Sequence, residues 1–281
     1  MNKKFSKGSL PMYVFTLLFV LLPLGFLVAM SLMQKSGALG YEAKLTIENY
    51  RLLADKTYIK TFLFSLRLSF ITTLITAGLG YPFAYFMWQC AKEKTKAFLL
   101  ILVILPFWTN ALVRIYGFII LLRGNGIVHS FLNFLGAGKD YGFLYTDWAV
   151  IMGMVYALLP FMIMTAYSAC SKLDKSVIEA ARDLGASSVR TFFTISLPMT
   201  VEGLLSGITM VFIPSMGLFF ISDLLGGGRV IIAGNLIKDQ IMTAHNYPFA
   251  AAISVVMLIT MLVCIEITRI LVKKIIRTEN I

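Results

Sequence analysis

The amino-acid sequence predicts an all-α membrane protein with six transmembrane helices. Composition is the first indication, because 58% of the residues are hydrophobic and only 14% are charged. Ordinary soluble domains contain about 45–50% apolar and about 25% charged residues. The second indication is a set of long apolar runs, each close to the roughly 20 residues that a helix needs to cross the hydrocarbon core.

Continuous apolar runs of this length favour helices over barrel strands, because a helix satisfies its own backbone hydrogen bonds within the bilayer. We expect a single transmembrane domain that covers residues 1–281, surrounded by membrane lipid. The predicted spans are approximately residues 11–33, 64–88, 98–122, 148–170, 201–222 and 248–271.

The first span follows three basic residues, Lys3, Lys4 and Lys7, which is also the arrangement of a signal peptide. Its apolar core is longer than the roughly 7–15 residues of a typical signal-peptide core. We therefore expect a retained helix, with a cleaved signal peptide as the alternative.

Basic residues in alternate loops predict the orientation, since cytoplasmic loops carry an excess of Lys and Arg. The alternation places both termini in the cytoplasm. The net charge of +11 then reflects topology rather than nucleic-acid binding. The predicted cytoplasmic residues are Lys3, Lys4, Lys7, Lys92, Lys94, Lys96, Lys172, Lys175, Arg182, Arg190, Lys273, Lys274 and Arg277. The predicted external ones are Lys35, Lys44, Arg51, Lys56, Lys60, Arg123, Lys139, Arg229 and Lys238, with acidic residues among them.

Catalytic and metal-binding signatures are not expected in this chain. The cysteines Cys90, Cys170 and Cys264 fall at predicted cytoplasmic ends of spans and form no CxxC pair, which favours packing over disulfides. His129 and His245 lie in separate loops without the spacing of metal ligands. The segment LGAGKDYG lacks the spacing of a phosphate-binding loop, so any ATP hydrolysis would belong to another chain.

The first external loop and the second span carry weaker signals. The segment LTIENYRLL in the loop predicts a short amphipathic helix at the membrane face. In the second span, Gly78, Gly80 and Pro82 permit close helix contact or a kink.

The third predicted span contains polar residues where lipid would surround them. Pro106 removes a backbone hydrogen bond near mid-membrane, so we expect a hinge there. Asn110 and Arg114 follow at i,i+4 spacing on one helix face. An arginine inside a span is costly, and it suggests either a transport pathway or a polar partner on a neighbouring helix. A structural hydrogen bond, or a side chain that extends to the interface, is the alternative for Arg114.

Aromatic residues accompany Arg114 in the same span. At about 100° per residue, Phe107 and Phe118 project towards roughly the Arg114 face, whereas Trp108 and Tyr116 lie well round the helix. We predict that Trp108, Tyr116 and Phe118 line a substrate pathway. Interfacial or packing roles are the alternative for Trp108 and Tyr116.

The fifth predicted span repeats this design. Pro214 and Gly217 interrupt the helix and are candidate hinge residues. Phe219, Phe220 and Asp223 follow before a run of three glycines, and we predict that they line the same pathway. Irregular membrane helices tend to line cavities, because their freed backbone groups need partners. Proline kinks that serve packing are the alternative.

A polar segment in the predicted cytoplasmic connection between spans four and five forms two short helices in our prediction. Asp174 caps the first helix, and Gly185 suits the left-handed position that ends it. Ser187 or Ser188 caps the second, and Pro198 stops it before span five. Physical reasoning alone leaves open whether this elbow docks a protein or is an ordinary amphipathic surface loop.

The elbow resembles the EAA signature of ABC-importer permeases. In that family the elbow is a coupling helix that docks into a groove on an ATPase subunit, which implies a coupling segment at residues 172–198. The resemblance also implies the type I importer fold, which is the MetI-like permease fold. Glu179 and Arg182, at i,i+3, can support the first helix. The residues that match the signature are Glu179, Ala180, Ala181, Gly185, Ile195, Leu197 and Pro198.

Further segments resemble the PotB-type permeases of spermidine/putrescine importers. They include GYPFAYF, LPFWTNALVRIYG, PSMGLFFISDLLGGG and GNLIKDQIMTAHNYPFAAA. The resemblance implies a bacterial inner-membrane complex with a second, PotC-type permease, two copies of a PotA-type ABC ATPase that uses ATP and Mg, and an extracytoplasmic PotD-type binding protein. It implies alternating access, in which the elbow transmits ATPase closure to spans three to six and an external gate lies near residues 214–228.

The residues themselves indicate a polycation only weakly. Trp108, Tyr116, Phe219 and Asp223 supply cation–π and charge-pairing chemistry, but Arg114 would repel a cation unless it is neutralised. Two alternatives stay open: a related ABC permease for a phosphonate, thiamine or ferric iron, and a secondary transporter or channel that works without an ATPase.

Overall fold

The computed structural model describes residues 10–37, 40–89, 92–124, 126–127, 129–130 and 142–278. The predictions for Lys3, Lys4, Lys7, Cys90 and Lys139, and for most of the LGAGKDYG segment, therefore lie outside the described residues. The described chain is predominantly helical and divides into two compact units, one of residues 1–60 with 236–260 and the other of residues 61–235 with 261–281.

The described helices include the predicted spans. Five helices are long and apolar enough to cross a membrane, and a sixth span is formed if one sharply bent helix pair counts as a single crossing. This confirms the all-α membrane fold, while the side on which the termini lie stays a prediction. The five are Pro11–Ser31, Lys56–Gln89, Asp147–Cys170, Ser188–Gly217 and Tyr247–Ile270, and the bent pair is Glu93–Trp108 with Ala111–Leu122.

The first unit begins with a helix whose side chains are almost all exposed, and continues into a small antiparallel hairpin. Asn49 is buried and donates hydrogen bonds to the carbonyl oxygens of Ser31 (2.9 Å) and Met33 (2.8 Å), which ties the hairpin to the helix after it. Tyr58 packs edge-on against Phe249, with ring centroids 5.1 Å apart. The elements are α1 (Leu10–Thr16), a π-turn (Leu17–Leu21), α2 (Leu22–Ser31), β1 (Met33–Gln34), β2 (Glu42–Leu45) and α3 (Glu48–Leu53).

The helix predicted over LTIENYRLL is shorter than expected, because its first residues do not belong to it. Leu45 belongs to β2, where it pairs with Met33 of β1. The Thr46 hydroxyl accepts a hydrogen bond from the Glu48 amide (3.1 Å), and the helix starts only at Glu48.

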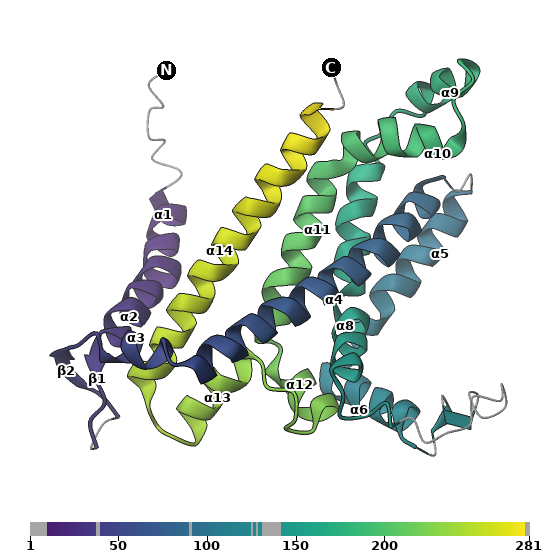
Figure 1. Ribbon diagram of the computed structural model, residues 1–281. Coiled ribbons are helices and arrows are strands. Elements are labelled where there is room, and N and C mark those ends of the chain that lie inside the picture. The colour runs from purple at the N-terminus through teal and green to yellow at the C-terminus, as the bar shows by residue number, and fades with distance from the viewer. Residues whose placement is uncertain are drawn as a thin grey trace. The chain divides into compact units, whose positions relative to one another are not determined.

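The second unit contains long helices joined by short ones, as Figure 1 shows. Within this unit, α9 and α10 lie at one end of α8 and α11, and α6 and α12 lie at the other end (Figure 1). Its elements, some continuing into the first unit, are α4 (Lys56–Gln89), α5 (Glu93–Ile104), the 3-10 turn η3 (Leu105–Trp108), α6 (Ala111–Leu122), α8 (Asp147–Cys170), α9 (Lys175–Asp183), α10 (Ser188–Thr191), the π-turn η4 (Phe192–Ser196), α11 (Leu197–Gly217), α12 (Phe219–Gly226), α13 (Ala233–Met242) and α14 (Tyr247–Thr278).

The third predicted span is not one helix but two that meet at 98°. Pro106 has no N–H to continue the α-helical ladder, and it lies in a 3-10 turn that ends at Thr109. Thr109 is extended (φ −93°, ψ 147°). Asn110 then starts α6, because its side-chain oxygen accepts a hydrogen bond from the Leu112 amide (2.8 Å). The interruption that the sequence predicts at Pro106 is therefore present as a sharp bend, and the role of Pro106 as a hinge stays a prediction.

The fifth predicted span also has different bounds. The helix ends at Gly217, and Leu218 (φ −73°, ψ 59°) separates it from α12. At its other end it runs continuously from Ser188, so Pro198 does not stop the second elbow helix. The preceding π-turn, in which the Leu197 amide bonds to the Phe192 carbonyl, widens the backbone where the proline cannot donate.

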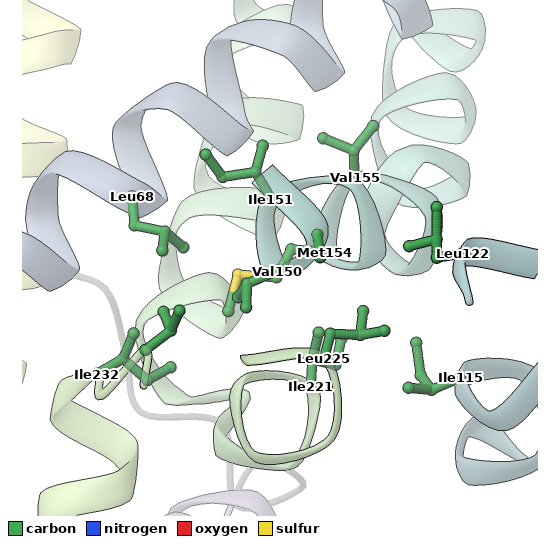
Figure 2. Close-up of a cluster of buried hydrophobic side chains, with 12 residues drawn as sticks. Leu68, Ile115, Leu122, Val150, Ile151, Met154, Val155, Ile221, Leu225 and Ile232 are labelled. Atoms are coloured by element: carbon green, nitrogen blue, oxygen red, sulfur yellow. The ribbon is translucent and has the colours of Figure 1, made fainter. Parts of the chain in front are cut away.

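Of the hydrophobic clusters in the described part of the second unit, two are large and a third, of Leu158, Met162 and Val211, is small. Figure 2 shows the first, which gathers Leu68 of α4, Ile115 of α6, Met154 of α8 and Ile221 of α12 around one contact region. The second joins α4, α5 and α8 near the elbow and includes the free thiol Cys170. Its buried members are Tyr81, Ala84, Met87, Trp88, Val103, Ile163, Ala166, Cys170, Leu173 and Ile178.

Candidate functional site

The elbow has the two short helices that the sequence predicts. Asp174 caps α9 by accepting a hydrogen bond from the Ser176 amide (3.0 Å), and this bond lowers the pKa of the Asp174 carboxyl. At the other end of α9, Gly185 has a left-handed backbone (φ +84°). Its amide bonds to the Arg182 carbonyl (2.8 Å) and the Ala186 amide bonds to the Ala181 carbonyl (3.0 Å), which is the Schellman ending that glycine favours.

Of the two candidate caps for the second elbow helix, the structure selects Ser187. Its hydroxyl accepts a hydrogen bond from the Arg190 amide (3.3 Å). Glu179 and Arg182 are both exposed and form no ion pair with each other in the described structure. Their predicted support of α9 therefore does not take the form of a salt bridge.

One face of the elbow is anchored and the other is free. Ile178 is only 5% exposed and packs in the second hydrophobic cluster, while the Lys175 ammonium lies 5.9 Å from the centre of the Trp88 ring of α4. In contrast, Leu184 is 89% exposed and Val189 is 68% exposed. An exposed apolar surface on a firmly anchored segment is typical of a protein docking site.

The residues of the EAA signature do not all lie on this free face. Glu179, Ala180 and Gly185 are exposed on the elbow. Ile195, Leu197 and Pro198 belong to the π-turn and the start of α11, where they are partly buried. The signature therefore covers both the exposed surface of the elbow and the backbone segment that connects the elbow to α11.

At the other end of the unit, Arg114 lies among aromatic rings. The carbon at the centre of its guanidinium is 5.8 Å from the ring centroid of Phe107 and 6.0 Å from that of Tyr156. Tyr156 stacks on Phe118, with centroids 5.6 Å apart and planes inclined by 14°, and Phe107 packs edge-on against Phe161 at 5.0 Å. We call these five residues the arginine–aromatic cluster. It brings together residues of η3, α6 and α8.

Only part of the predicted third-span pathway joins this cluster. Arg114 and Phe118 do, whereas Asn110 is the helix cap described above and accepts the Arg114 amide hydrogen bond at its backbone carbonyl (3.2 Å). The pathway role of Asn110 stays a prediction. Trp108 is 89% exposed and Tyr116 is 55% exposed, and neither has a ring contact within the described part of the chain. Helical periodicity accounts for this division, because it places Phe118 towards the Arg114 face and Trp108 and Tyr116 well round the helix.

The cluster also contains two residues that the sequence did not single out, Tyr156 and Phe161 of α8. Their spacing within a uniformly apolar helix carries no sign that they face Arg114 of another helix. The one indication in the sequence was Arg114, because a buried charged side chain within a membrane span needs partners on a neighbouring helix.

The second part of the predicted pathway centres on Asp223 of α12. Asn235, which is 3% exposed, donates a 2.6 Å hydrogen bond to the Asp223 carboxylate. The Asn235 side-chain oxygen Oδ1 accepts a hydrogen bond from the Ile232 amide (2.9 Å). Phe219 and Phe220 meet edge-on at 6.5 Å. Asn235 was missed by sequence reasoning, since nothing in its neighbourhood identifies a partner on another element.

Phe220 and Phe118 both pack against the first hydrophobic cluster, so they border the same core from α12 and α6. The helix break between Pro214 and Phe219 lies close by in the chain. A side chain at Gly234 would come within 2.7 Å of the Gly217 carbonyl oxygen, so the break is in close backbone contact with the start of α13. The helix continues through Pro214 and is interrupted only after Gly217, at Leu218, and the role of Pro214 and Gly217 as hinge residues stays a prediction.

A groove of about 890 Å³ lies elsewhere in the second unit, between α4, α11 and α14. Its lining is mainly apolar, with four charged residues: Arg67, Glu202, Glu266 and Arg269. Glu266 and Arg269 pair with each other at 3.5 Å. None of the predicted pathway residues lines this groove.

Comparison with known proteins agrees with the membrane-spanning helical architecture. Residues 79–277 match the family described as "Binding-protein-dependent transport system inner membrane component". The chain is 43% identical over 245 residues to the spermidine/putrescine transport system permease protein PotB of Escherichia coli (strain K12), which covers 87% of this chain and 89% of the relative. It is 42% identical over 256 residues to PotB of Haemophilus influenzae (strain ATCC 51907 / DSM 11121 / KW20 / Rd), with 90% and 89% covered. The inner membrane ABC transporter permease protein YdcU of Escherichia coli (strain K12) is 31% identical over 228 residues, with 77% and 72% covered.

Solved structures resemble the fold at lower identity. A chain of a bacterial alginate ABC transporter, in complex with an alginate pentasaccharide-bound periplasmic protein, superposes with a TM-score of 0.74 at 17% identity, over 95% of this chain and 93% of that chain. A chain of the inward-facing MetNI methionine ABC transporter gives a TM-score of 0.54 at 15% identity, over 84% and 99%. These likenesses show the importer permease fold.

Proposed function

The chain belongs to the family of inner membrane components of binding-protein-dependent transport systems, and from this premise we propose that it moves polyamines through an ATP-driven importer for spermidine and putrescine. It is a multi-pass permease of an ABC importer. The observation that carries the substrate assignment is the 42–44% identity, over 87–90% of this chain, to relatives named as spermidine/putrescine permeases.

In the proposed complex, this chain pairs with a second, PotC-type permease, and two copies of a PotA-type ABC ATPase bind the cytoplasmic side. A PotD-type binding protein delivers the substrate from outside. ATP and Mg are bound by the ATPase. The anchored elbow with its exposed Leu184 and Val189 supports this assignment, because a docking surface of this kind needs a protein partner.

The proposed mechanism is alternating access. ATPase closure would move the elbow at residues 172–198, and the continuous helix from Ser188 to Gly217 would carry that movement towards α12. The break at Leu218 would serve as the external gate, with Pro214 and Gly217 as its hinge. The pathway would run past Phe118, Phe219, Phe220 and Asp223.

The test is uptake by the assembled complex. The chain would be co-expressed with the other permease, the ATPase and the binding protein, and reconstituted into proteoliposomes. We expect ATP-dependent uptake of radiolabelled spermidine that unlabelled putrescine inhibits. A complex whose ATPase lacks its phosphate-binding lysine is the control, and it should show no uptake.

Two results would contradict the proposal in different ways. Uptake that continues without the ATPase would indicate a stand-alone secondary transporter. ATP-dependent uptake of a phosphonate, thiamine or ferric iron, but not of spermidine, would support an ATP-driven importer but would show that its substrate is not a polyamine.

A further inference from the structure

The Arg114 guanidinium occupies a site that suits a cation. Phe107 and Tyr156 both lie within about 6 Å of its central carbon, the range in which the negative face of an aromatic ring attracts a positive charge. Each of these rings is held by another ring, Phe107 by Phe161 and Tyr156 by Phe118. The site is therefore braced by its own neighbours and does not depend on Arg114 alone for its shape.

Arg114 itself is held in this site without hydrogen bonds that would satisfy it. Its Nε and Nη1 atoms are buried and have no hydrogen-bond partner among the described residues. No acidic side chain in the described part of the chain pairs with it. A buried charged donor without an acceptor is unfavourable. The rings thus supply the main attraction, and the resting position of Arg114 is weakly held.

The rings would accept another cation in the same way. Cation–π attraction depends on charge and distance, so an alkylammonium group can replace a guanidinium. The two cations cannot occupy the site together, because like charges a few ångströms apart repel strongly where water is scarce. Either Arg114 or an ammonium group from outside fills it.

The chain geometry lets Arg114 leave. Phe107 lies on the turn before the 98° bend, Arg114 lies on the short helix α6 after it, and Tyr156 lies on α8. A change of the Arg114 side-chain rotamer would withdraw its guanidinium without moving α6, so Phe107 and Tyr156 would keep their supporting rings, Phe161 and Phe118.

We propose that Arg114 is a tethered cation that occupies an ammonium-binding site formed by Phe107 and Tyr156, and that a polyamine enters this site by displacing it. The proposal rests on the proposed function, since it takes a polyamine as the competing cation. Arg114 then sets specificity: a passing monovalent cation gains little from displacing it, whereas a polyamine has further ammonium groups that bind elsewhere along the path. Repulsion between Arg114 and an incoming ammonium group then drives the Arg114 guanidinium out of the ring site.

The test measures binding of radiolabelled spermidine to the assembled transporter in nanodiscs, without the binding protein. Arg114→Gln should empty the site and tighten spermidine binding about tenfold, while Arg114→Lys, which keeps a cation, should bind as the wild type does. Adding Tyr156→Leu to Arg114→Gln should return the affinity to the wild-type value. Arg229→Gln is the matched control, because Arg229 is an exposed arginine outside the cluster. Size-exclusion chromatography establishes that each complex assembles.

Three results would overturn the proposal. The first is that Arg114→Gln binds spermidine no more tightly than the wild type. The second is that Arg114→Lys behaves as Arg114→Gln does, which would remove charge as the determinant. The third is that Tyr156→Leu leaves the gain of Arg114→Gln intact. Wild-type uptake, measured in parallel, separates these results from failure of the proposed function. If the wild type imports no spermidine, the polyamine assignment is contradicted, and the present proposal is contradicted with it. Tighter binding of tetramethylammonium by Arg114→Gln than by the wild type would in that case still show that the ring site exists.

Discussion

Tyr81 and Thr200 share a buried hydrogen bond between their hydroxyl groups, although 119 residues separate them in the chain. One helical turn further along α4, Tyr85 bonds to Ser196 in the same way at 3.1 Å. The first bond joins α4 to the start of α11, and the second joins α4 to the π-turn within the elbow segment. Any movement of the elbow would therefore be passed to α4 as well as to α11.

The two ends of the Tyr81–Thr200 bond should respond differently to substitution. In Thr200→Val the Tyr81 hydroxyl, on a side chain that is 4% exposed, loses its partner, and we expect a loss of about 1–3 kcal/mol in the free energy of unfolding. In Tyr81→Phe, Thr200 keeps its bond to the Ser196 carbonyl (2.7 Å), so the loss should be nearer about 0.5–1.5 kcal/mol. Denaturant unfolding in detergent measures both, and a larger loss for Tyr81→Phe would contradict this account.

Gly185→Val should uncouple the elbow from transport. The left-handed backbone at Gly185 costs a side chain about 1–2 kcal/mol, although nothing within 4 Å would clash with it. We expect uptake and co-purification of the ATPase to fall while membrane insertion is retained. Gly25→Val, in open space and without a positive φ, is the matched control. Normal uptake by Gly185→Val would show that the elbow geometry is not needed for coupling.

Gly203→Ala should weaken the contact between α8 and α11. The added methyl group would clash with the Ala169 methyl and come within 3.1 Å of the Thr165 carbonyl oxygen, and neither neighbour is a flexible chain end. Overpacking of this kind costs about 1–3 kcal/mol. Gly78→Ala, with nothing within 4 Å, should leave stability unchanged or raise it. Equal thermal unfolding midpoints for the two variants would argue against close packing at Gly203.

Asn235→Ala should destabilise the connection between α12 and α13. It removes a donor to Asp223 and the acceptor of the Ile232 amide, with an expected loss of about 1–3 kcal/mol. Asn235→Asp should cost at least as much, because it places a second carboxylate beside Asp223. Thr243→Ala, at an exposed position of the same region, serves as the control. Unchanged unfolding of Asn235→Ala would contradict the structural role.

The Asp174 cap makes a prediction about pH. The Ser176 backbone hydrogen bond lowers the folded-state pKa of Asp174 below its ordinary value of 3.8, so the cap stabilises α9 above that value and is lost as pH falls through the lowered pKa. Hydrogen exchange of the α9 amides should be faster in Asp174→Ala at neutral pH, and close to wild type in Asp174→Asn, which keeps the acceptor. Equal protection in Asp174→Ala would show that the cap does not hold the helix.

Much of the fold and part of the candidate site could be predicted from interactions between residues close together in the sequence. Asp174, Gly185 and Ser187 act through hydrogen bonds between residues a few positions apart, so their roles follow from residue type and position. Arg114 could be singled out because a charge in an apolar span demands a partner. Its ring partner Tyr156 could not, since α8 is apolar on every side and its periodicity does not say which side faces α6.

Apolar runs, caps and breakers in the sequence by itself determined the membrane class, the approximate spans and the two-helix elbow, because each depends on interactions within a few residues. Tertiary structure alone decided which side chains meet. It brought Asn235 to Asp223 and Tyr156 to Arg114. These outcomes depend on how separate helices are oriented, and helix orientation is set by packing between residues far apart in the chain.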